Sequence, residues 1–104
     1  MNENFDEISK SFKEFIKLDQ PMSPQEAIEK LSAFHKTSAE NILVAFPNLK
    51  FSLEKPEEGE TIKFEETVNS GYPCISIKTY NKNGEFIRSE LINEFTGQPQ
   101  AKCG

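Results

Sequence analysis

Residues 72–94 read YPCISIKTYNKNGEFIRSELINE, which is two alternating runs on either side of a polar turn. Alternation of apolar and polar residues predicts half-buried β-strands, here over 72–80 and 85–94. Gly84 suits the last place of a three-residue loop, 82–84, built on a type I turn followed by a residue with positive φ. The pattern therefore predicts an antiparallel hairpin.

The length of this loop determines which side chains share a face of the sheet. A three-residue loop pairs residue 81 with 85 and residue 75 with 91. It gathers the apolar side chains on one face, namely Ile75, Ile77, Thr79, Ile87 and Leu91. The other face then carries Lys78, Tyr80, Phe86, Arg88 and Glu90. A two-residue Asn-Gly turn would shift the register by one and set Ile77 opposite Glu90. Because a one-residue slip reverses the facing of every side chain, we prefer the three-residue loop.

The same period of two continues towards the N-terminus. Leu49, Phe51 and Leu53 alternate with polar residues and predict a strand over 49–54. Ile62, Phe64 and Val68 predict a further strand, and the polar residues 55–60 between the two form a loop. With the hairpin, these segments predict a four-stranded antiparallel meander, because the connections are short.

The first part of the chain has helical periodicity instead. Five large apolar residues share one helical face between about 4 and 18: Phe5, Ile8, Phe12, Phe15 and Ile16. Ser23-Pro24-Gln25-Glu26 is a strong helix start, with a hydroxyl cap, proline at the first helical position and glutamate three residues after the cap. A second helix is therefore expected over about 24–36.

Thr37 and Glu40 repeat this capping pattern and predict a short helix over 38–46, which Pro47 ends. The apolar run 42–46 is equally compatible with a buried strand, since short apolar runs are ambiguous by period. A single bent helix over 24–46 is a third interpretation.

Helices followed by strands are typical of an α+β domain. We expect two N-terminal helices and a short third helix packed on one face of the four-stranded antiparallel meander. Residues 1–95 form one compact domain and residues 96–104 a flexible tail. The outline resembles several folds, cystatin-like ones among them, but the QxVxG hairpin of cystatin inhibitors is missing, so that activity is not implied.

The net charge of the chain limits the kinds of partner that it can bind. The chain has 17 acidic and 12 basic residues, a net charge of −5, and Arg88 is its only arginine. Such a surface repels nucleic acid and anionic membranes, and arginine is the preferred reader of phosphate. A protein partner with a basic surface is compatible, because acidic patches steer cationic surfaces into encounter.

The two cysteines, Cys74 and Cys103, do not form the dense framework of a small secreted domain. We interpret them as free thiols. The first ten residues lack the pattern of a signal peptide, so the expected location is the cytoplasm.

No group of residues in the sequence has the spacing of a catalytic or metal site. His35 is the only histidine, and no spacing links it to a nucleophile. Paired cysteines or histidines at zinc spacing, a calcium loop and a phosphate-binding glycine motif are also missing from the sequence. We therefore expect a protein that is not an enzyme, with no metal and no cofactor.

Two features remain as candidate contact surfaces. The first is the acidic region that contains Glu57, Glu58, Glu60, Glu65 and Glu66, which would attract a basic partner. The second is the outer face of the hairpin, where Tyr80, Phe86 and Arg88 would anchor that partner.

The hypothesis that follows is a small acidic binding protein that blocks or sequesters a basic protein partner. Bacterial immunity proteins, antitoxins and phage anti-defence inhibitors fit this size and charge as a class. A homodimeric secretion or assembly chaperone is the alternative, with the first helix as the dimer surface, and a small-ligand-binding domain is the third. The protein is expected to be a monomer or a homodimer.

Overall fold

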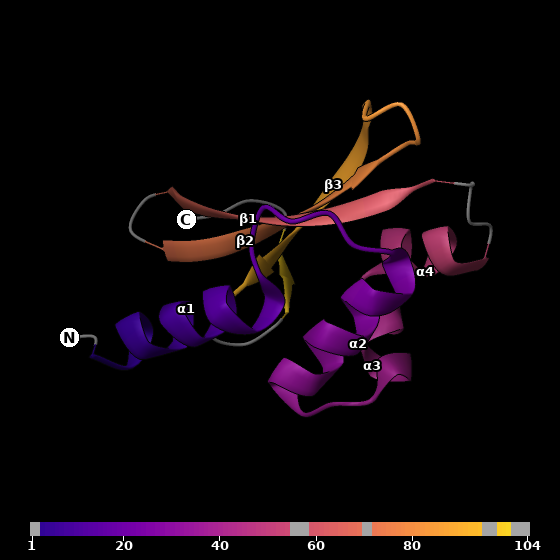
Figure 1. The fold of residues 1–104 in the computed structure, drawn as a ribbon. Coiled ribbons are helices and arrows are strands. Elements are labelled where there is room, and N and C mark those ends of the chain that lie inside the picture. The colour runs from indigo at the N-terminus through magenta and orange to yellow at the C-terminus, as the bar shows by residue number, and fades with distance from the viewer. Residues whose placement is uncertain (1–2, 55–58, 70–71, 95–97, 101–104) are drawn as a thin grey trace.

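The computed structural model describes residues 3–54, 59–69, 72–94 and 98–100. Four helices come first, and they are α1 (Glu3–Ile16), α2 (Pro24–His35), α3 (Ala39–Ala45) and α4 (Pro47–Glu54). The strands follow, and they are β1 (Thr61–Asn69), β2 (Tyr72–Tyr80), β3 (Phe86–Asn93) and the two-residue β4 (Pro99–Gln100). Figure 1 shows the sheet as one layer and the helices as a second layer on one of its faces. The class is α+β.

The capping signals locate α2 correctly, and they place α3 correctly apart from its cap, which is Ser38 and not the predicted Thr37. The Ser23 hydroxyl accepts a hydrogen bond from the Glu26 N–H at 3.1 Å, with Pro24 at the start of α2. Lys36 ends α2 in the left-handed conformation with φ of 53°, and Ser38 caps α3. Because the chain turns at these residues, neither a strand over 42–46 nor one bent helix over 24–46 exists.

The expected strand over 49–54 is wrong, because this segment is helix α4. Pro47 ends α3 and also occupies the first position of α4, where its fixed φ favours a helix and its missing N–H costs nothing. Leu49 and Ser52 are buried on one face of α4, whereas Phe51 is half exposed. Three residues in alternation could not distinguish this helix from a strand.

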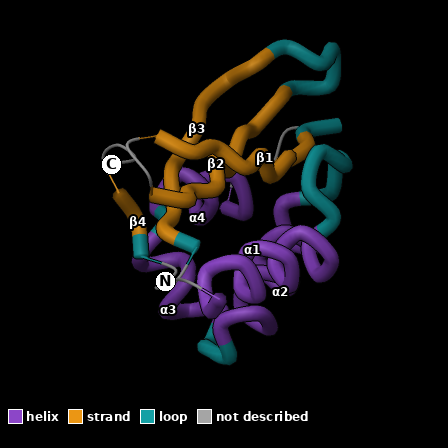
Figure 2. The backbone as a smooth tube through the Cα atoms, turned by 90° about the vertical axis from the view of Figure 1, so that its left-hand side faces the viewer, coloured by secondary structure: helices purple, strands orange, loops and turns teal. Residues whose placement is uncertain are grey.

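The sheet consequently differs from the expected meander. The strand order is β1-β2-β3-β4, and neighbouring strands are antiparallel. Three long strands form the sheet, and the short β4 pairs with β3 at one edge. Pro99 and Gln100, which lie in the segment expected to be a tail, pair with Ile92 and Leu91. Figure 2 shows β4 at the sheet edge opposite β1.

The hairpin turn is as predicted, but the register beyond it is not. Asn81 bonds with Glu85 and Gly84 across the loop, and Gly84 has φ of 82°. Tyr80 pairs with Phe86, but Thr79 pairs with Arg88, so a β-bulge leaves Ile87 as an extra residue.

The bulge changes the facing of every later residue in β3. Ile77 pairs with Glu90 and Ile75 with Ile92. Arg88 and Glu90 therefore turn towards the helices, where the sequence predicted an apolar face. The charges are accommodated there by polar partners on α4 and in the segment before β1, as described below.

One core lies between the helices and the inner face of the sheet. It contains Phe12, Ile16, Met22, Ala27, Ile28, Leu31, Ile42, Phe46, Leu49, Ile62, Phe64, Ile75, Ile77 and Ile92. Phe12 links the layers, since its ring lies 4.8 Å from that of Phe34 on α2 and 6.4 Å from that of Phe64 on β1. Among the described residues, no helix combines the length and the apolar character needed to cross a membrane.

Candidate functional site: a groove between α1 and β1

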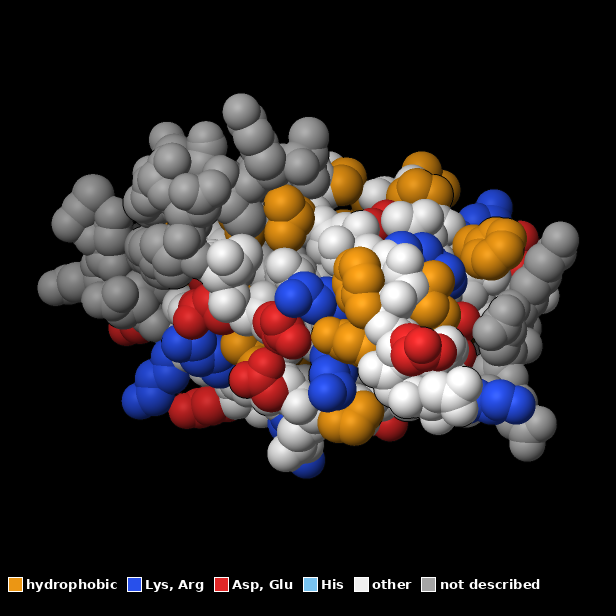
Figure 3. All heavy atoms as spheres, turned by 90° about the horizontal axis from the view of Figure 1, so that it is seen from above, with side chains coloured by type: hydrophobic (Ala, Val, Ile, Leu, Met, Phe, Trp, Pro, Cys, Tyr) orange, Lys and Arg blue, Asp and Glu red, His pale blue; other side chains and the backbone are white. Residues whose placement is uncertain are grey.

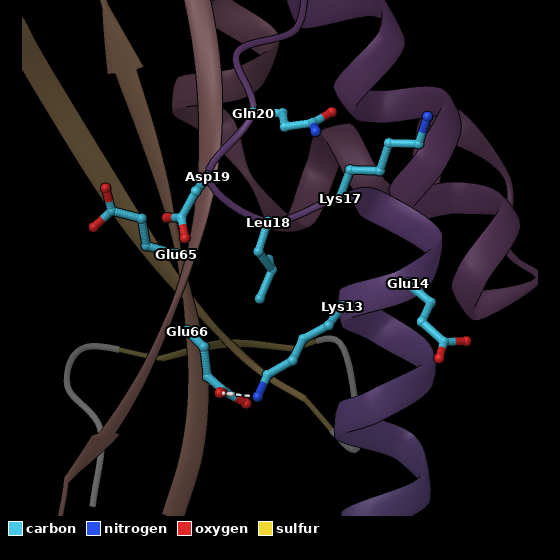
Figure 4. A pocket seen from close by; sticks show the side chains of 8 residues that line it. All are labelled: Lys13, Glu14, Lys17, Leu18, Asp19, Gln20, Glu65 and Glu66. Atoms are coloured by element: carbon cyan, nitrogen blue, oxygen red, sulfur yellow. Dashed lines mark ion pairs between the residues drawn. The ribbon is translucent and has the colours of Figure 1, made fainter.

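A surface hollow lies where α1 ends beside β1. It has a volume of about 740 Å³ and is lined by Lys13, Glu14, Lys17, Leu18, Asp19, Gln20, Glu65 and Glu66. Figure 4 shows Lys13 reaching from α1 to Glu66 on β1, with Leu18 between the two elements and Asp19 and Glu65 on the strand side. We call this hollow the α1–β1 groove. Four carboxylates against two lysines give its lining a net negative charge.

The shape of the groove follows from how the chain leaves α1. Lys17 and Asp19 have positive φ values of 53° and 69°, which turn the backbone sharply after the helix. The chain then runs along the free edge of β1: the Asp19 N–H bonds to the Phe64 carbonyl at 2.8 Å. Met22 and Ile62 exchange two backbone hydrogen bonds, of 3.0 and 2.8 Å. These contacts cover the first half of the strand edge and leave the groove beside the second half.

A polar cluster ties α1 to the inner face of the sheet next to the groove. The Lys13 ammonium lies 2.6 Å from Glu66, and the Ser9 hydroxyl donates to the same carboxylate at 2.5 Å. Burial by itself would raise the pKa of Glu66, but the hydrogen bonds from Lys13 and Ser9 outweigh it and hold the pKa below its usual value. The pKa of Lys13 is raised by the same hydrogen bond.

Glu94 completes this cluster from the end of β3. Its side chain is fully buried next to the Glu66 carboxylate and the Ser9 hydroxyl. Burial, and then the neighbouring Glu66 carboxylate, raise the pKa of Glu94 to about 7. Glu94 does not line the groove, so it acts on the attachment of α1 and not on the groove contents.

The acids at the mouth of the groove differ in how they are paired. Glu65 points to the outer face of the sheet and forms an ion pair of 2.8 Å with Lys78, which raises the pKa of that lysine. Glu14 and Asp19 have no ion-pair partner among the described residues. These two carboxylates are available to a bound cation.

The acidic region predicted from the sequence is not one surface. Glu65 and Glu66 are adjacent in β1 but lie on opposite faces of the sheet, and both line the groove. Glu60 is buried elsewhere, and Glu57 and Glu58 lie outside the described residues.

The predicted hairpin anchor is also divided. Tyr80 and Phe86 lie together on the outer face, with ring centroids 6.0 Å apart, and Lys63 lies over the Tyr80 ring. Figure 3, which looks onto this face, shows charged and apolar side chains intermixed over its described part. Arg88 lies on the other face, because the bulge at Ile87 turns it towards α4.

Arg88 instead forms a second polar cluster beneath α4. It donates to the Ser52 hydroxyl, lies 3.9 Å from the buried Glu60 carboxylate, and stacks over the Phe51 ring. Glu90 accepts the Asn48 N–H at the start of α4. Burial raises the pKa of Glu90, and the backbone N–H groups of α4 oppose that rise.

The sequence did not single out Ser9, Lys13, Asp19 or Glu94 as site residues. Glu94 carries a usable signal, because it has the same parity as Ile92 in β3 and so shares its buried face. Lys13 lies one turn before Ile16 and four residues after Ser9, which places the polar cluster on one side of α1. Nothing local predicts Asp19, whose position depends on the backbone turn.

The remaining reactive residues do not form a site. The His35 ring lies among aromatic rings, 4.9 Å from Phe34 and 6.2 Å from Phe12, and burial lowers its pKa. Cys74 is buried and disulfide-bonded, so its interpretation as a free thiol was wrong, and Cys103 lies outside the described residues. In the described ranges, no three His, Cys, Asp or Glu side chains are grouped as metal ligands.

Comparisons with known protein families, with curated proteins and with solved structures give no match.

Proposed function

We propose that this chain is a small acidic binding protein that takes a basic segment of a protein partner into the α1–β1 groove and acts by occluding that partner. The observation that carries the proposal is the groove itself, whose rim holds the two carboxylates of Glu14 and Asp19 without ion-pair partners. A cationic side chain bound there replaces water with direct charge-assisted hydrogen bonds. The net charge of −5 adds long-range attraction for a basic partner.

Binding without catalysis is the mode of action that fits the described side chains. The one carboxyl group whose pKa is raised to about 7, Glu94, is buried away from the groove lining. His35 packs against the rings of Phe12 and Phe34, and its Nε2 has no hydrogen-bond partner among the described residues. A nucleophile and a base within hydrogen-bond reach would be needed for covalent chemistry.

The alternative of a homodimeric chaperone loses its main support. Such a dimer was expected to form through an apolar face of the sheet or of a helix, and the first helix was the named candidate. Phe12 and Ile16 of that face are fully buried within the chain, and Phe15 is partly exposed. A small-ligand-binding domain is disfavoured because the groove is open at the surface and lined mostly by charged side chains, whereas ligand pockets are mostly apolar.

We also propose that the protein is located in the cytoplasm, as the sequence predicted, and the redox state of Cys74 tests this location. Cytoplasmic thiols are normally kept reduced, whereas Cys74 is disulfide-bonded. Alkylation of the protein in its native cells, followed by mass spectrometry, reports the redox state of Cys74. A reduced Cys74 in the cells supports a cytoplasmic location. An oxidised Cys74 contradicts it unless the disulfide is shielded from glutathione.

The binding proposal is tested with a flexible basic probe, the capped peptide Ac-(Lys-Gly)4-NH2. We expect it to shift the NMR signals of groove-lining amides, with an affinity that falls steeply as salt is raised. The double variant Glu14→Gln/Asp19→Asn should weaken binding about fivefold or more. A matched control, Glu26→Gln/Glu40→Gln, removes the same charge from α2 and α3 and should leave the affinity nearly unchanged.

Equal weakening by both double variants contradicts the proposal, because it shows attraction to net charge without a site. Signal shifts spread over the whole surface contradict it in the same way.

A further inference from the structure

We propose that the basic segment binds as an added β-strand on the free edge of β1, next to residues 66–69, and thereby extends the sheet by one strand. The inference rests on the proposed function and specifies the conformation of the partner in the same groove. Extended peptides commonly bind exposed sheet edges in this way, with backbone hydrogen bonds for affinity and alternate side chains for specificity.

The first argument is the position of β1 in the sheet. It is the outermost strand, with β2 on its other side. The edge is already used as a pairing surface, because Met22 and Ile62 exchange two backbone hydrogen bonds and the Phe64 carbonyl accepts the Asp19 N–H. Pairing then stops, because Asp19 has a positive φ and the chain turns away into α1.

The second argument is the direction of the backbone groups beyond that point. The N–H and C=O of Ile62 point to the edge, and the β1–β2 register continues without a bulge. With a period of two, the same groups of Glu66 and Val68 also point to the edge. No segment within the described part of the chain pairs with them there. Unpaired strand edges are ready templates for another chain.

The third argument is charge, which favours a basic segment over a second copy of this chain. On an added strand, one set of alternate side chains faces the side of Glu65 and the other faces Leu18 and Glu66. A lysine or arginine in the first set can reach the Glu65 and Asp19 carboxylates, which lie on the strand side of the groove (Figure 4). Antiparallel pairing of two copies of β1 in this region would place the acidic pairs Glu65 and Glu66 near each other, and like charges across strands are destabilising.

The test uses the capped peptide Ac-Lys-Val-Lys-Val-Lys-Val-NH2 and two N-methylated forms of it. One form is methylated on the three lysine nitrogens, the other on the three valine nitrogens. In an added strand only one of these sets faces β1, so only one form should lose affinity, by tenfold or more. The unmethylated peptide should also slow hydrogen exchange at the Glu66 and Val68 amides by about tenfold, with little change on the outer edge of β3.

The protein variant Val68→Pro supplies a second readout. It removes an N–H that points to the edge and not to β2, so the β1–β2 ladder is kept. We expect weaker peptide binding than in the control Val68→Thr, which retains the N–H. The methylated peptides keep the inference falsifiable even if Val68→Pro does not fold.

Three outcomes overturn the inference. If both methylated peptides bind as well as the parent peptide, the segment does not bind as a strand, while the proposed function survives. If none of the three peptides binds the groove, the proposed function fails as well. If sedimentation shows a dimer of the protein alone with the Glu66 and Val68 amides already protected, the edge belongs to a second copy of the chain.

Discussion

The inner face of the sheet carries two polar clusters that contain the same kinds of side chain. Each has one serine from a helix, one cationic residue and two glutamates. The α1 cluster comprises Ser9, Lys13, Glu66 and Glu94, and the α4 cluster comprises Ser52, Glu60, Arg88 and Glu90. They nevertheless differ in how completely the glutamates are paired.

The difference begins with the cationic residue. Lys13 reaches the sheet from α1, remains 49% exposed and forms its ion pair with Glu66, so Glu94 has no ion pair of its own among the described residues. Arg88 belongs to the sheet itself and is 21% exposed; its guanidinium contacts Ser52, Glu60 and the Phe51 ring together. A guanidinium presents five donors in a plane, whereas an ammonium is a compact point charge.

The second glutamate of each cluster shows the same contrast. Glu90 accepts the Asn48 N–H at the start of α4, where the helix dipole favours a negative charge. Glu94 has no such donor within the described residues. The comparison teaches that the α4 cluster combines a counter-charge from the sheet with a backbone donor from the helix, whereas in the α1 cluster two neighbouring carboxyl groups share one lysine.

The largest expected effect is in the α4 cluster. Arg88→Met should lower the free energy of unfolding by about 3 kcal/mol, because it leaves the Glu60 carboxylate buried without a counter-charge. Arg88→Lys keeps the charge but loses the planar fork, and should cost less, about 1–2 kcal/mol. Urea denaturation measures both. Lys82→Met, an exposed cation in the neighbouring turn, is the control and should be nearly neutral. A loss below 1 kcal/mol for Arg88→Met would make the two clusters equivalent.

The next effect is the pH dependence of the α1 cluster. The pKa of Glu94 is raised from 4.5 to about 7, so its stabilising contribution is complete below pH 4.5 and is lost as the pH rises through 7. Glu94→Gln removes this loss and should raise the free energy of unfolding at pH 8 by about 2 kcal/mol, with little change at pH 5.

The pKa shifts of two other groups change the stability in the opposite direction as the pH changes. The lowered pKa values of His35 and Glu66 give contributions that are lost as the pH falls. The difference between Glu94→Gln and the natural protein cancels the contribution of His35, which is present in each, and reports Glu94 together with its effect on Glu66. Stability curves that run parallel from pH 5 to pH 8 would mean that Glu94 is not a proton-dependent contact. Glu29→Gln, on the exposed side of α2, should give such parallel curves.

The sequence predicted those features that depend on neighbouring residues. The cap at Ser23 and the turn at Gly84 are local signals, and each lies where the structure needs it, whereas the cap of α3 is Ser38 and not the predicted Thr37. Helix α4 was missed because Pro47 was interpreted only as the end of α3. A proline that ends one helix is also a favoured first residue of the next.

The predicted contact surfaces were less accessible to prediction. The groove depends on the positive φ values of Lys17 and Asp19, and the predicted hairpin anchor depends on a single extra residue in β3. The bulge at Ile87 moves Arg88 from the outer face to the helix side, and no local pattern encodes it. The rule that charges avoid an apolar face failed here because Ser52 and Glu60 provide partners from distant parts of the chain. Tertiary partners of this kind cannot be identified from alternation alone.

The smallest effect sharpens the comparison between the two cations. Lys13→Met should cost only about 0.5–1 kcal/mol in low salt, because a half-exposed ion pair gains little over water. In 1 M NaCl this cost should largely vanish, since screening acts mainly on exposed pairs.

A double-mutant cycle of Lys13→Met with Glu66→Gln measures the coupling energy of this pair. The matched cycle of Arg88→Met with Glu60→Gln should give a larger coupling energy that salt barely changes. A Lys13–Glu66 coupling as large and as salt-resistant as that of Arg88 and Glu60 would show that exposure does not separate the clusters. The raised pKa of Glu94 would then be the main difference that remains between them.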